Sequence, residues 1–193
     1  MTEPPGTRER ILDAAERLFA ERGFDATPTS IIAGAAGVPK GLLFYYFPTK
    51  HDLLRALVSE RLDLGPIDPG ALVEPGDPVG ALLNLSKALS DIQAESAVLG
   101  VIVWREQRTH PDVRAKLREY RHQVQGIVER VLRGSVLAPI TTRALHAAAA
   151  AWVAILSIRP HADHGESGED AGIDLRALAE LICAGLDASP APA

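Results

Sequence analysis

Apolar residues recur at the spacing of an α-helix along most of the chain, and this feature sets the fold class. In the segment 8–22 one stripe of the helix surface holds Ile11, Ala14, Ala15, Leu18 and Phe19. This spacing is typical of an amphipathic helix with one buried face. The sequence has no sustained alternation of apolar and polar residues and no Asn-Gly or Asp-Gly hairpin between apolar runs, which are the signals of strands. The sequence therefore predicts an all-α protein.

Start and stop signals divide the N-terminal part into short helices. The helix over 8–22 ends at Gly23, since glycine accepts the backbone conformation that follows a helix. Thr27 and Pro28 predict the N-cap and the first residue of a second, short helix that extends to Gly34.

Two further helices are expected before residue 65. Gly37 supplies a turn after the second helix, and a third short helix is expected over 39–46. A fourth helix is expected over 50–63, where Thr49 and Asp52 form the pattern of a capping box.

Prolines and glycines interrupt the helical pattern over 65–78 and predict a linker or loop. After this segment the apolar spacing returns. Further helices are expected over 79–95, 97–109, 112–133, 141–158 and 173–187.

Composition excludes several classes of protein. The chain has 193 residues, 47% of them hydrophobic and 23% charged, which is typical of globular proteins rather than disordered ones. Cys183 is the single cysteine, so an internal disulfide is excluded. The longest uncharged apolar stretch, 144–158, has 15 residues, whereas a membrane-spanning helix needs about 20. With no secretory signal pattern, we expect a cytoplasmic protein that does not cross a membrane.

The charge is unevenly distributed. The net charge is −5, yet residues 1–62 hold eight Lys and Arg against eight Asp and Glu, and the remainder holds twelve against seventeen. A neutral N-terminal part can approach phosphate if its positive side chains share one face. Charge alone neither predicts nor excludes DNA binding.

Three short helices and a longer one suggest a helix-turn-helix module, whose second helix enters the major groove of DNA. The segments TRERILDAAERLFAERGFDAT and AGVPKGLLFYYFPTKHDLLRAL closely resemble the N-terminal domain of the TetR/AcrR family of transcriptional regulators, over roughly residues 7–58. The resemblance implies a three-helix helix-turn-helix domain over 1–48, a connecting helix over 49–64, and a larger helical ligand-binding and dimerisation domain over 65–193.

Candidate DNA-binding residues follow from the chemistry of this module. Lysines supply charge for phosphate, tyrosines supply hydroxyl groups, and Gly41 permits a close approach of the backbone. Thr27 is first interpreted as a helix cap, and any of these side chains can instead be core or solvated surface. The candidates are Thr27, Lys40, Gly41, Leu42, Tyr45, Tyr46 and Lys50, and the resemblance to the family adds Thr29.

The sequence departs from the family pattern at four positions. Pro39, Leu42 and Phe44 stand where side chains with hydrogen-bonding groups or small side chains are common, and Ile31 stands where an acidic residue is common. The changes are compatible with the fold, since proline suits a helix start and Phe packs as Tyr does. They predict an unusual operator preference or affinity, and Leu42 suits a thymine methyl group.

The C-terminal half is more apolar than a DNA-binding module requires, which favours a regulatory domain. Residues 97–104 are apolar around nearly the whole helix and suit a central helix that lines a cavity. Aromatic rings with polar tips, together with nearby amides, are typical of a small-molecule pocket, although they also occur in an ordinary core. The candidate effector-binding residues are Trp104, Gln107, Tyr120 and Gln123.

The last two helices are candidates for a dimer interface. The resemblance implies that they form a four-helix bundle with a second copy of the chain. The alternative is that their apolar residues are buried within one subunit. The candidate interface residues are Trp152, Ile155, Leu178, Leu181 and Ile182.

Metal and cofactor chemistry is not expected. His161, Asp163, His164 and Glu166 lie close in sequence, but they lack helical i, i+4 spacing and a cysteine partner. Cys183 lies on an apolar helix and is interpreted as a small core residue.

These observations predict a homodimeric, ligand-responsive transcriptional regulator. We expect a repressor that a small-molecule effector of unknown identity releases from a near-palindromic operator in double-stranded DNA. One alternative is a helical interaction protein with a degenerate helix-turn-helix, as the departures at Pro39, Leu42 and Phe44 would permit. A second is an all-α enzyme, although the sequence carries no catalytic motif.

Overall fold

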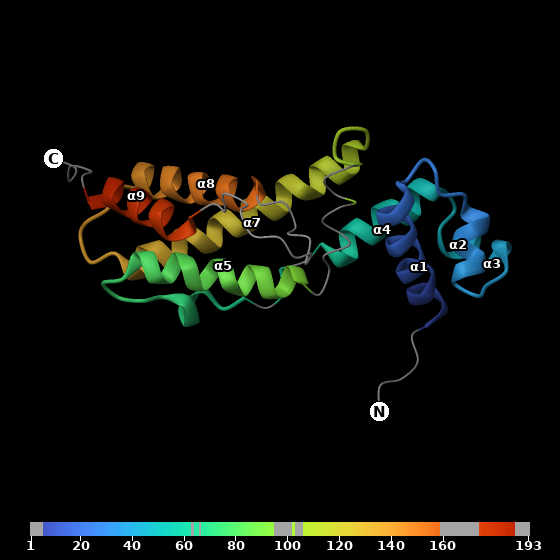
Figure 1. Cartoon of the computed structure of the whole chain (residues 1–193), viewed down its shortest axis with the longest axis horizontal. Coiled ribbons are helices and arrows are strands. Elements are labelled where there is room, and N and C mark those ends of the chain that lie inside the picture. The colour runs from blue at the N-terminus through green and yellow to red at the C-terminus, as the bar shows by residue number, and fades with distance from the viewer. Residues whose placement is uncertain are drawn as a thin grey trace, which may run out of the picture. The chain divides into compact units, whose positions relative to one another are not determined.

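The computed structural model describes residues 6–62, 64–65, 67–94, 102, 106–158 and 174–187. Within these ranges all regular elements are helices, which confirms the predicted all-α class (Figure 1). None of the helices in the described ranges is long and apolar enough to cross a membrane. The helices are α1 (Thr7–Arg22), α2 (Thr29–Ala35), α3 (Lys40–Tyr46), α4 (Lys50–Arg61), α5 (Pro78–Ala94), α7 (Pro111–Ser135), α8 (Thr142–Ile158) and α9 (Leu175–Asp187), with a short 3-10 helix η1 (Pro69–Leu72).

The helix boundaries agree with the start and stop signals in the sequence. Eight of the nine predicted helices are present, with ends within two residues of the expected positions. The ninth, over 97–109, lies mostly outside the described residues. The 3-10 helix η1 was not predicted, because its single turn carries no periodic pattern.

The predicted N-cap of α2 is wrong. The helix begins at Thr29 with Pro28 at the N-cap, and no side chain caps it. Pro39 likewise precedes α3 as its N-cap, with ψ 142° in the extended region. A proline has a fixed φ and no N–H, so it can stand directly before a helix without losing a hydrogen bond.

The chain divides into two compact units. The first contains residues 1–63 and 96–119, and the second contains residues 64–95 and 120–193. The boundaries that we expect at residues 48 and 64 remain a prediction. The domain over 65–193 that the resemblance implies includes residues 96–119, which the contacts within the chain group with residues 1–63.

The core of the first unit explains why the short helices form. Helix α1 packs against α2, α3 and α4. Each buried aliphatic or aromatic side chain contributes roughly 1.5–3 kcal/mol, which isolated seven-residue helices need because they are unstable alone. The fully buried residues include Ile11 and Phe19 of α1, Ile32 of α2, Leu43 of α3, and Leu53, Leu54 and Leu57 of α4.

The second unit has its own core. Helix α9 lies beside both α5 and α8 (Figure 1). Cys183 on α9 is buried, in agreement with its interpretation as a core residue. Other buried residues are Leu82 and Leu85 of α5, Val128 and Leu132 of α7, Trp152 of α8, and Ala179 and Leu186 of α9.

Candidate nucleic-acid interface

The turn between α2 and α3 depends on one glycine. Gly37 has a φ of +65°, a conformation that side chains other than glycine rarely adopt. The backbone N–H of Val38 donates to the carbonyl of Ala33 at 3.0 Å, and that of Gly37 donates to Gly34 at 3.1 Å. These two hydrogen bonds form a Schellman motif, which ends α2 and turns the chain into α3.

Helix α3 is anchored by its inner face and exposes the rest. Leu43 is fully buried, whereas Lys40, Gly41 and Tyr45 are exposed. Tyr45 is 77% exposed and lies opposite Leu43 on the helix. Because the inner face is buried, the only part of α3 that can meet a macromolecule is the side with Gly41 and Tyr45 at its centre.

Apolar side chains flank this outer side of α3. Phe44 is 37% exposed and Leu42 is half-buried. The ammonium of Lys40 lies 5.7 Å from the centre of the Phe44 ring, within the range of a cation–π contact. The outer surface of α3 therefore combines one positive charge with aromatic and aliphatic groups.

Gly41 is not required by the packing of the protein itself. A Cβ atom placed on Gly41 would meet no other atom within 4 Å, and its φ is not in the left-handed region. Glycine in a helix costs about 0.5–1 kcal/mol relative to alanine. The packing of the protein therefore leaves the glycine at this exposed position unexplained, and the close approach of DNA that we expect there remains a prediction.

The helix-turn-helix carries no negative side chain over its two central helices. Between Asp25 and Asp52 the sequence contains no Asp or Glu, while it contains Lys40 and Lys50. This stretch includes the whole of α2 and α3. A surface of this composition is compatible with a polyanion even though the chain as a whole is acidic.

Thr27 has a structural role. Its side chain is fully buried, and its hydroxyl donates to the carbonyl of Gly23 at 2.7 Å and lies 3.3 Å from that of Leu18. These contacts hold the segment before α2 against the end of α1. A buried hydroxyl has no surface for DNA, so we leave Thr27 out of the proposed contacts. Thr29, at the first position of α2, is half-buried.

Lys50 contacts the turn that follows α1. Its ammonium donates to the carbonyl of Asp25 at 3.3 Å and lies 4.4 Å from the centre of the Phe24 ring. Burial lowers the pKa of Lys50, while the charges of Asp25 and Glu106 act in the opposite direction. Lys50 therefore positions the turn after α1, and the phosphate contact that we expect from it remains a prediction.

The N-terminus of α4 is capped by hydrogen bonds with nearby side chains. The predicted capping box is confirmed: the N–H of Asp52 donates to the Thr49 hydroxyl oxygen at 3.0 Å, and the N–H of Thr49 donates to the Asp52 carboxylate at 3.1 Å. The same carboxyl group accepts from the guanidinium of Arg55 at 2.6 Å. The Asp52 carboxylate therefore accepts hydrogen bonds from both Thr49 and Arg55.

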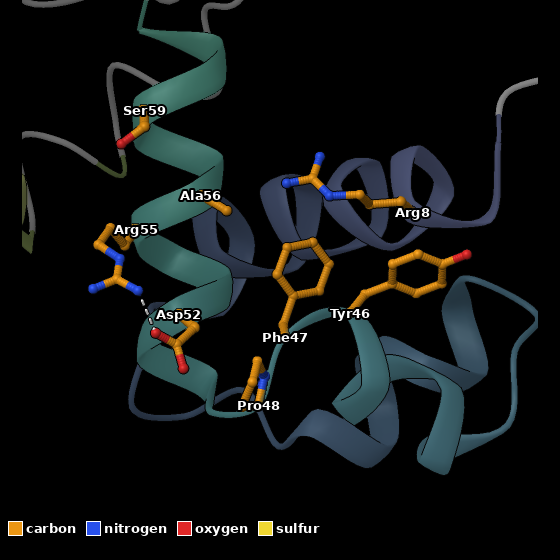
Figure 2. A pocket seen from close by; sticks show the side chains of 8 residues that line it. All are labelled: Arg8, Tyr46, Phe47, Pro48, Asp52, Arg55, Ala56 and Ser59. Atoms are coloured by element: carbon orange, nitrogen blue, oxygen red, sulfur yellow. Dashed lines mark hydrogen bonds and ion pairs between the residues drawn. The ribbon is translucent and has the colours of Figure 1, made fainter.

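A surface pocket of about 360 Å³ lies between α1 and the segment 46–59 (Figure 2). It is lined by Arg8, Tyr46, Phe47, Pro48, Asp52, Arg55, Ala56 and Ser59. Both arginines are already paired: Arg8 with Glu60 at 2.5 Å, and Arg55 with Asp52. Tyr46 faces this pocket, and its ring lies 5.3 Å from that of Tyr45. Tyr45 is thus the more accessible of the two predicted tyrosines.

Sequence reasoning missed a side-chain cluster around the buried Phe24 and Glu106 in the first unit. Glu106 is buried and accepts the backbone N–H of Phe24 at 3.1 Å. The Phe24 ring lies 5.1 Å from that of His51 and 4.6 Å from that of His110. Nε2 of His110 lies 3.3 Å from the Glu106 carboxylate. No local pattern signals such a contact, because the partners are far apart in the sequence.

The candidate effector-binding residues fall in different places. Trp104 lies outside the described residues. Gln107 belongs to the first unit and is half-buried. In the second unit, Tyr120 is buried and Gln123 is exposed. Their assignment to an effector site stays a prediction.

The candidate interface residues on α8 and α9 differ in exposure. Leu181 is 70% exposed, which is unusual for a leucine on an apolar helix. Ile155, Leu178 and Ile182 are half-buried. Trp152 is fully buried within its own unit, so its side chain has no surface to offer a second copy. The alternative of burial within one subunit therefore applies to Trp152.

Two short helices joined by a glycine turn, packed on α1 and followed by α4, define the helix-turn-helix class of protein. Residues 11–57 match the profile of the family described as "Bacterial regulatory proteins, tetR family". Over these residues the chain is similar to a family of regulatory proteins.

Relatives with known names agree with this family. The chain is 40% identical over 89 residues to the HTH-type transcriptional regulator AcrR of Shigella flexneri, covering 43% of this chain and 40% of that protein. It is 39% identical over 71 residues to the HTH-type transcriptional repressor KstR2 of Rhodococcus jostii strain RHA1, covering 33% of this chain and 35% of that protein. The matched segments thus span about two fifths or less of these relatives.

The fold as a whole is also that of a known structure. The TetR family transcriptional regulator PfmR from Thermus thermophilus superposes with a TM-score of 0.64 at 24% identity, covering 93% of this chain and 96% of that one. At this identity the similarity establishes the fold.

Proposed function

We propose that the protein is a homodimeric transcriptional regulator that binds a near-palindromic operator and is released from it by a small-molecule effector. The observation that carries the proposal is the outer side of α3, where Gly41 and Tyr45 lie in a segment free of acidic residues. In this arrangement α3 enters the major groove and α2 crosses the backbone.

The proposed contacts with DNA divide by chemistry. Lys40 and Lys50 supply charge to phosphate, with Thr29 and Tyr46 as additional hydroxyl donors. Gly41 brings the helix backbone close to the groove, and Leu42 and Tyr45 lie on the side that faces base edges. Repression is the regulatory outcome that we propose, as in the repressor KstR2.

Dimerisation supports this function geometrically. Two copies related by a two-fold axis place their α3 helices in successive major grooves, about 34–36 Å apart. The exposed Leu181 and the half-buried Ile155, Leu178 and Ile182 on α8 and α9 supply an apolar surface for this contact. The two α3 helices can lie at different spacings in different conformations of the dimer. An effector acts by binding one of these conformations more tightly than another.

A footprint of the purified protein on the DNA upstream of its own gene tests the proposal. At near-physiological salt and with excess non-specific competitor, we expect a protected site with two-fold symmetry. Selection of bound fragments from the whole genome extends the test to distant operators. If neither experiment recovers a specific site, the proposal is wrong and the protein acts through its helical surfaces instead.

A further inference from the structure

The side chains of α3 offer few groups for reading base pairs by hydrogen bonds. Residues 40–46 contain no Arg, Asn, Gln, Asp, Glu, Ser or Thr. The polar groups that remain are the ammonium of Lys40 and the hydroxyls of Tyr45 and Tyr46. Tyr46 lines the pocket beside Phe47 (Figure 2) and is 37% exposed, against 77% for Tyr45.

Each base presents different chemistry in the major groove. Guanine is read by Arg or Lys, adenine by the amide of Asn or Gln, and cytosine by a carboxylate. Of these partners α3 has only Lys40. Thymine is the base that also presents an apolar group, its C5 methyl, which apolar side chains contact.

The apolar side chains of α3 occupy the positions from which base edges are reached. Leu42 and Phe44 are two residues apart, so they lie on opposite flanks of the line through Gly41 and Tyr45. Both retain exposed surface. Because Gly41 has open space above its Cα atom, the helix axis can approach the groove closely enough for these flanking side chains to reach it.

We propose that α3 recognises its DNA half-site through thymine methyl groups, with Leu42 and Phe44 as the specificity-determining side chains. This inference rests on the proposed function, because it names the base chemistry that the DNA-binding helix selects. The operator half-site is accordingly rich in thymine at the positions that α3 covers.

The test replaces thymine by deoxyuridine, which removes only the C5 methyl group. A duplex is first selected by the full-length protein from a randomised library, and is then synthesised with deoxyuridine at each thymine of one half-site in turn. We expect about fourfold weaker binding at each contacted position, which is the effect of removing one buried methyl group at about 0.8 kcal/mol. Thymines outside the footprint of α3 serve as internal controls.

Leu42→Ala and Phe44→Ala assign the effect to individual side chains. At the thymine that the missing side chain contacts, each variant should bind thymine and deoxyuridine duplexes equally. At the other thymines it should still bind deoxyuridine more weakly. This double-mutant cycle separates the contact from any change in DNA shape. Leu137→Ala is the matched control, because Leu137 is 80% exposed and belongs to the second unit. It should leave every penalty unchanged.

The outcomes separate this inference from the proposed function. Specific binding that is insensitive to deoxyuridine at every thymine overturns the inference and leaves the DNA-binding function intact. A penalty that persists in both variants also overturns it, since another element then reads the methyl groups. Failure to select any specific duplex overturns the proposed function itself, and the inference with it.

Discussion

The carboxylate of Glu106 accepts the backbone N–H of Phe24 across 82 residues of sequence. The contact is buried, and it joins the turn after α1 to the segment that precedes α7. The Thr109 hydroxyl and Nε2 of His110 lie 3.4 and 3.3 Å from the other oxygen of the same carboxylate. The position of the turn after α1 therefore depends on a residue from a distant part of the chain.

Removing this carboxylate should destabilise the protein. Glu106→Ala leaves the buried N–H of Phe24 without an acceptor, which costs about 1–3 kcal/mol. Glu106→Gln keeps an acceptor oxygen and should cost less. Urea unfolding followed by circular dichroism measures both variants. Equal stability of Glu106→Ala and the wild type would show that the hydrogen bond contributes nothing.

Substitution of Gly41 should separate folding from DNA binding. Gly41→Ala meets no atom of the protein and should raise the free energy of unfolding by about 0.5–1 kcal/mol. The added methyl group should also weaken operator binding, because it holds α3 away from the groove. Gly126→Ala is the matched control: it lies within α7, also has open space, and should be stabilising without any loss of DNA affinity.

Titration calorimetry and thermal unfolding of these two glycine variants measure the two effects separately. An alanine at position 41 that leaves DNA affinity unchanged would show that no close approach occurs there.

Lys40→Ala should lower DNA affinity and its salt dependence together. A lysine that contacts phosphate contributes about one unit to the slope of log K against log salt concentration. Filter binding at a series of salt concentrations measures this slope. Lys87→Ala, an exposed lysine on α5 that pairs with Asp91, is the control and should change neither quantity. An unaltered slope in Lys40→Ala would remove Lys40 from the phosphate contacts.

Leu181→Asp should dissociate the dimer that we propose. A buried, unpaired carboxylate costs roughly 3–5 kcal/mol, so the dimer dissociation constant should rise by about 100-fold or more. Light scattering coupled to size-exclusion chromatography gives the mass of the species. Leu137→Asp introduces the same charge at a leucine of the second unit that is also largely exposed, and should remain dimeric. A dimer that tolerates aspartate at 181 places the interface elsewhere.

The capping box of α4 should make stability depend on pH. The hydrogen bond from the Thr49 hydroxyl lowers the pKa of the Asp52 carboxyl in the folded protein. A lowered pKa stabilises the folded state above the unfolded value of about 3.9, and this contribution is lost as the pH falls through the folded value. Asp52→Ala should therefore be less stable than the wild type at neutral pH, and the difference should disappear in acid.

Thermal unfolding of both proteins over this pH range measures the difference. Thr49→Ala removes the hydrogen bond that shifts the pKa and should reproduce the same trend. A difference that is constant with pH would mean that Asp52 acts through packing alone.

Local signals in the sequence were sufficient for the helices but not for the contacts between distant segments. The capping box of Thr49 and Asp52 and the glycine turn at Gly37 depend on residues within one or two turns of each other, so the sequence predicts them. Thr27 is a residue type that commonly caps helices. In the structure it is buried instead, and its hydroxyl donates to the carbonyl of Gly23 at the end of α1. The burial of Trp152 depends on packing in the second unit, which no periodic pattern distinguishes from a dimer surface.

Because α2 ends in a Schellman motif at Gly37, the crossing of α2 and α3 depends on the stereochemistry of this residue. A Cβ atom at this residue would meet only Arg10, at an ordinary contact distance of 3.9 Å, so space does not demand glycine there. The demand comes from the sign of φ, which is strained for an L-residue by about 1–2 kcal/mol and natural for its mirror image. A D-alanine introduced by chemical synthesis would fit this turn where L-alanine does not. The direction in which α3 leaves α2 is thus set by the handedness permitted at a single α-carbon.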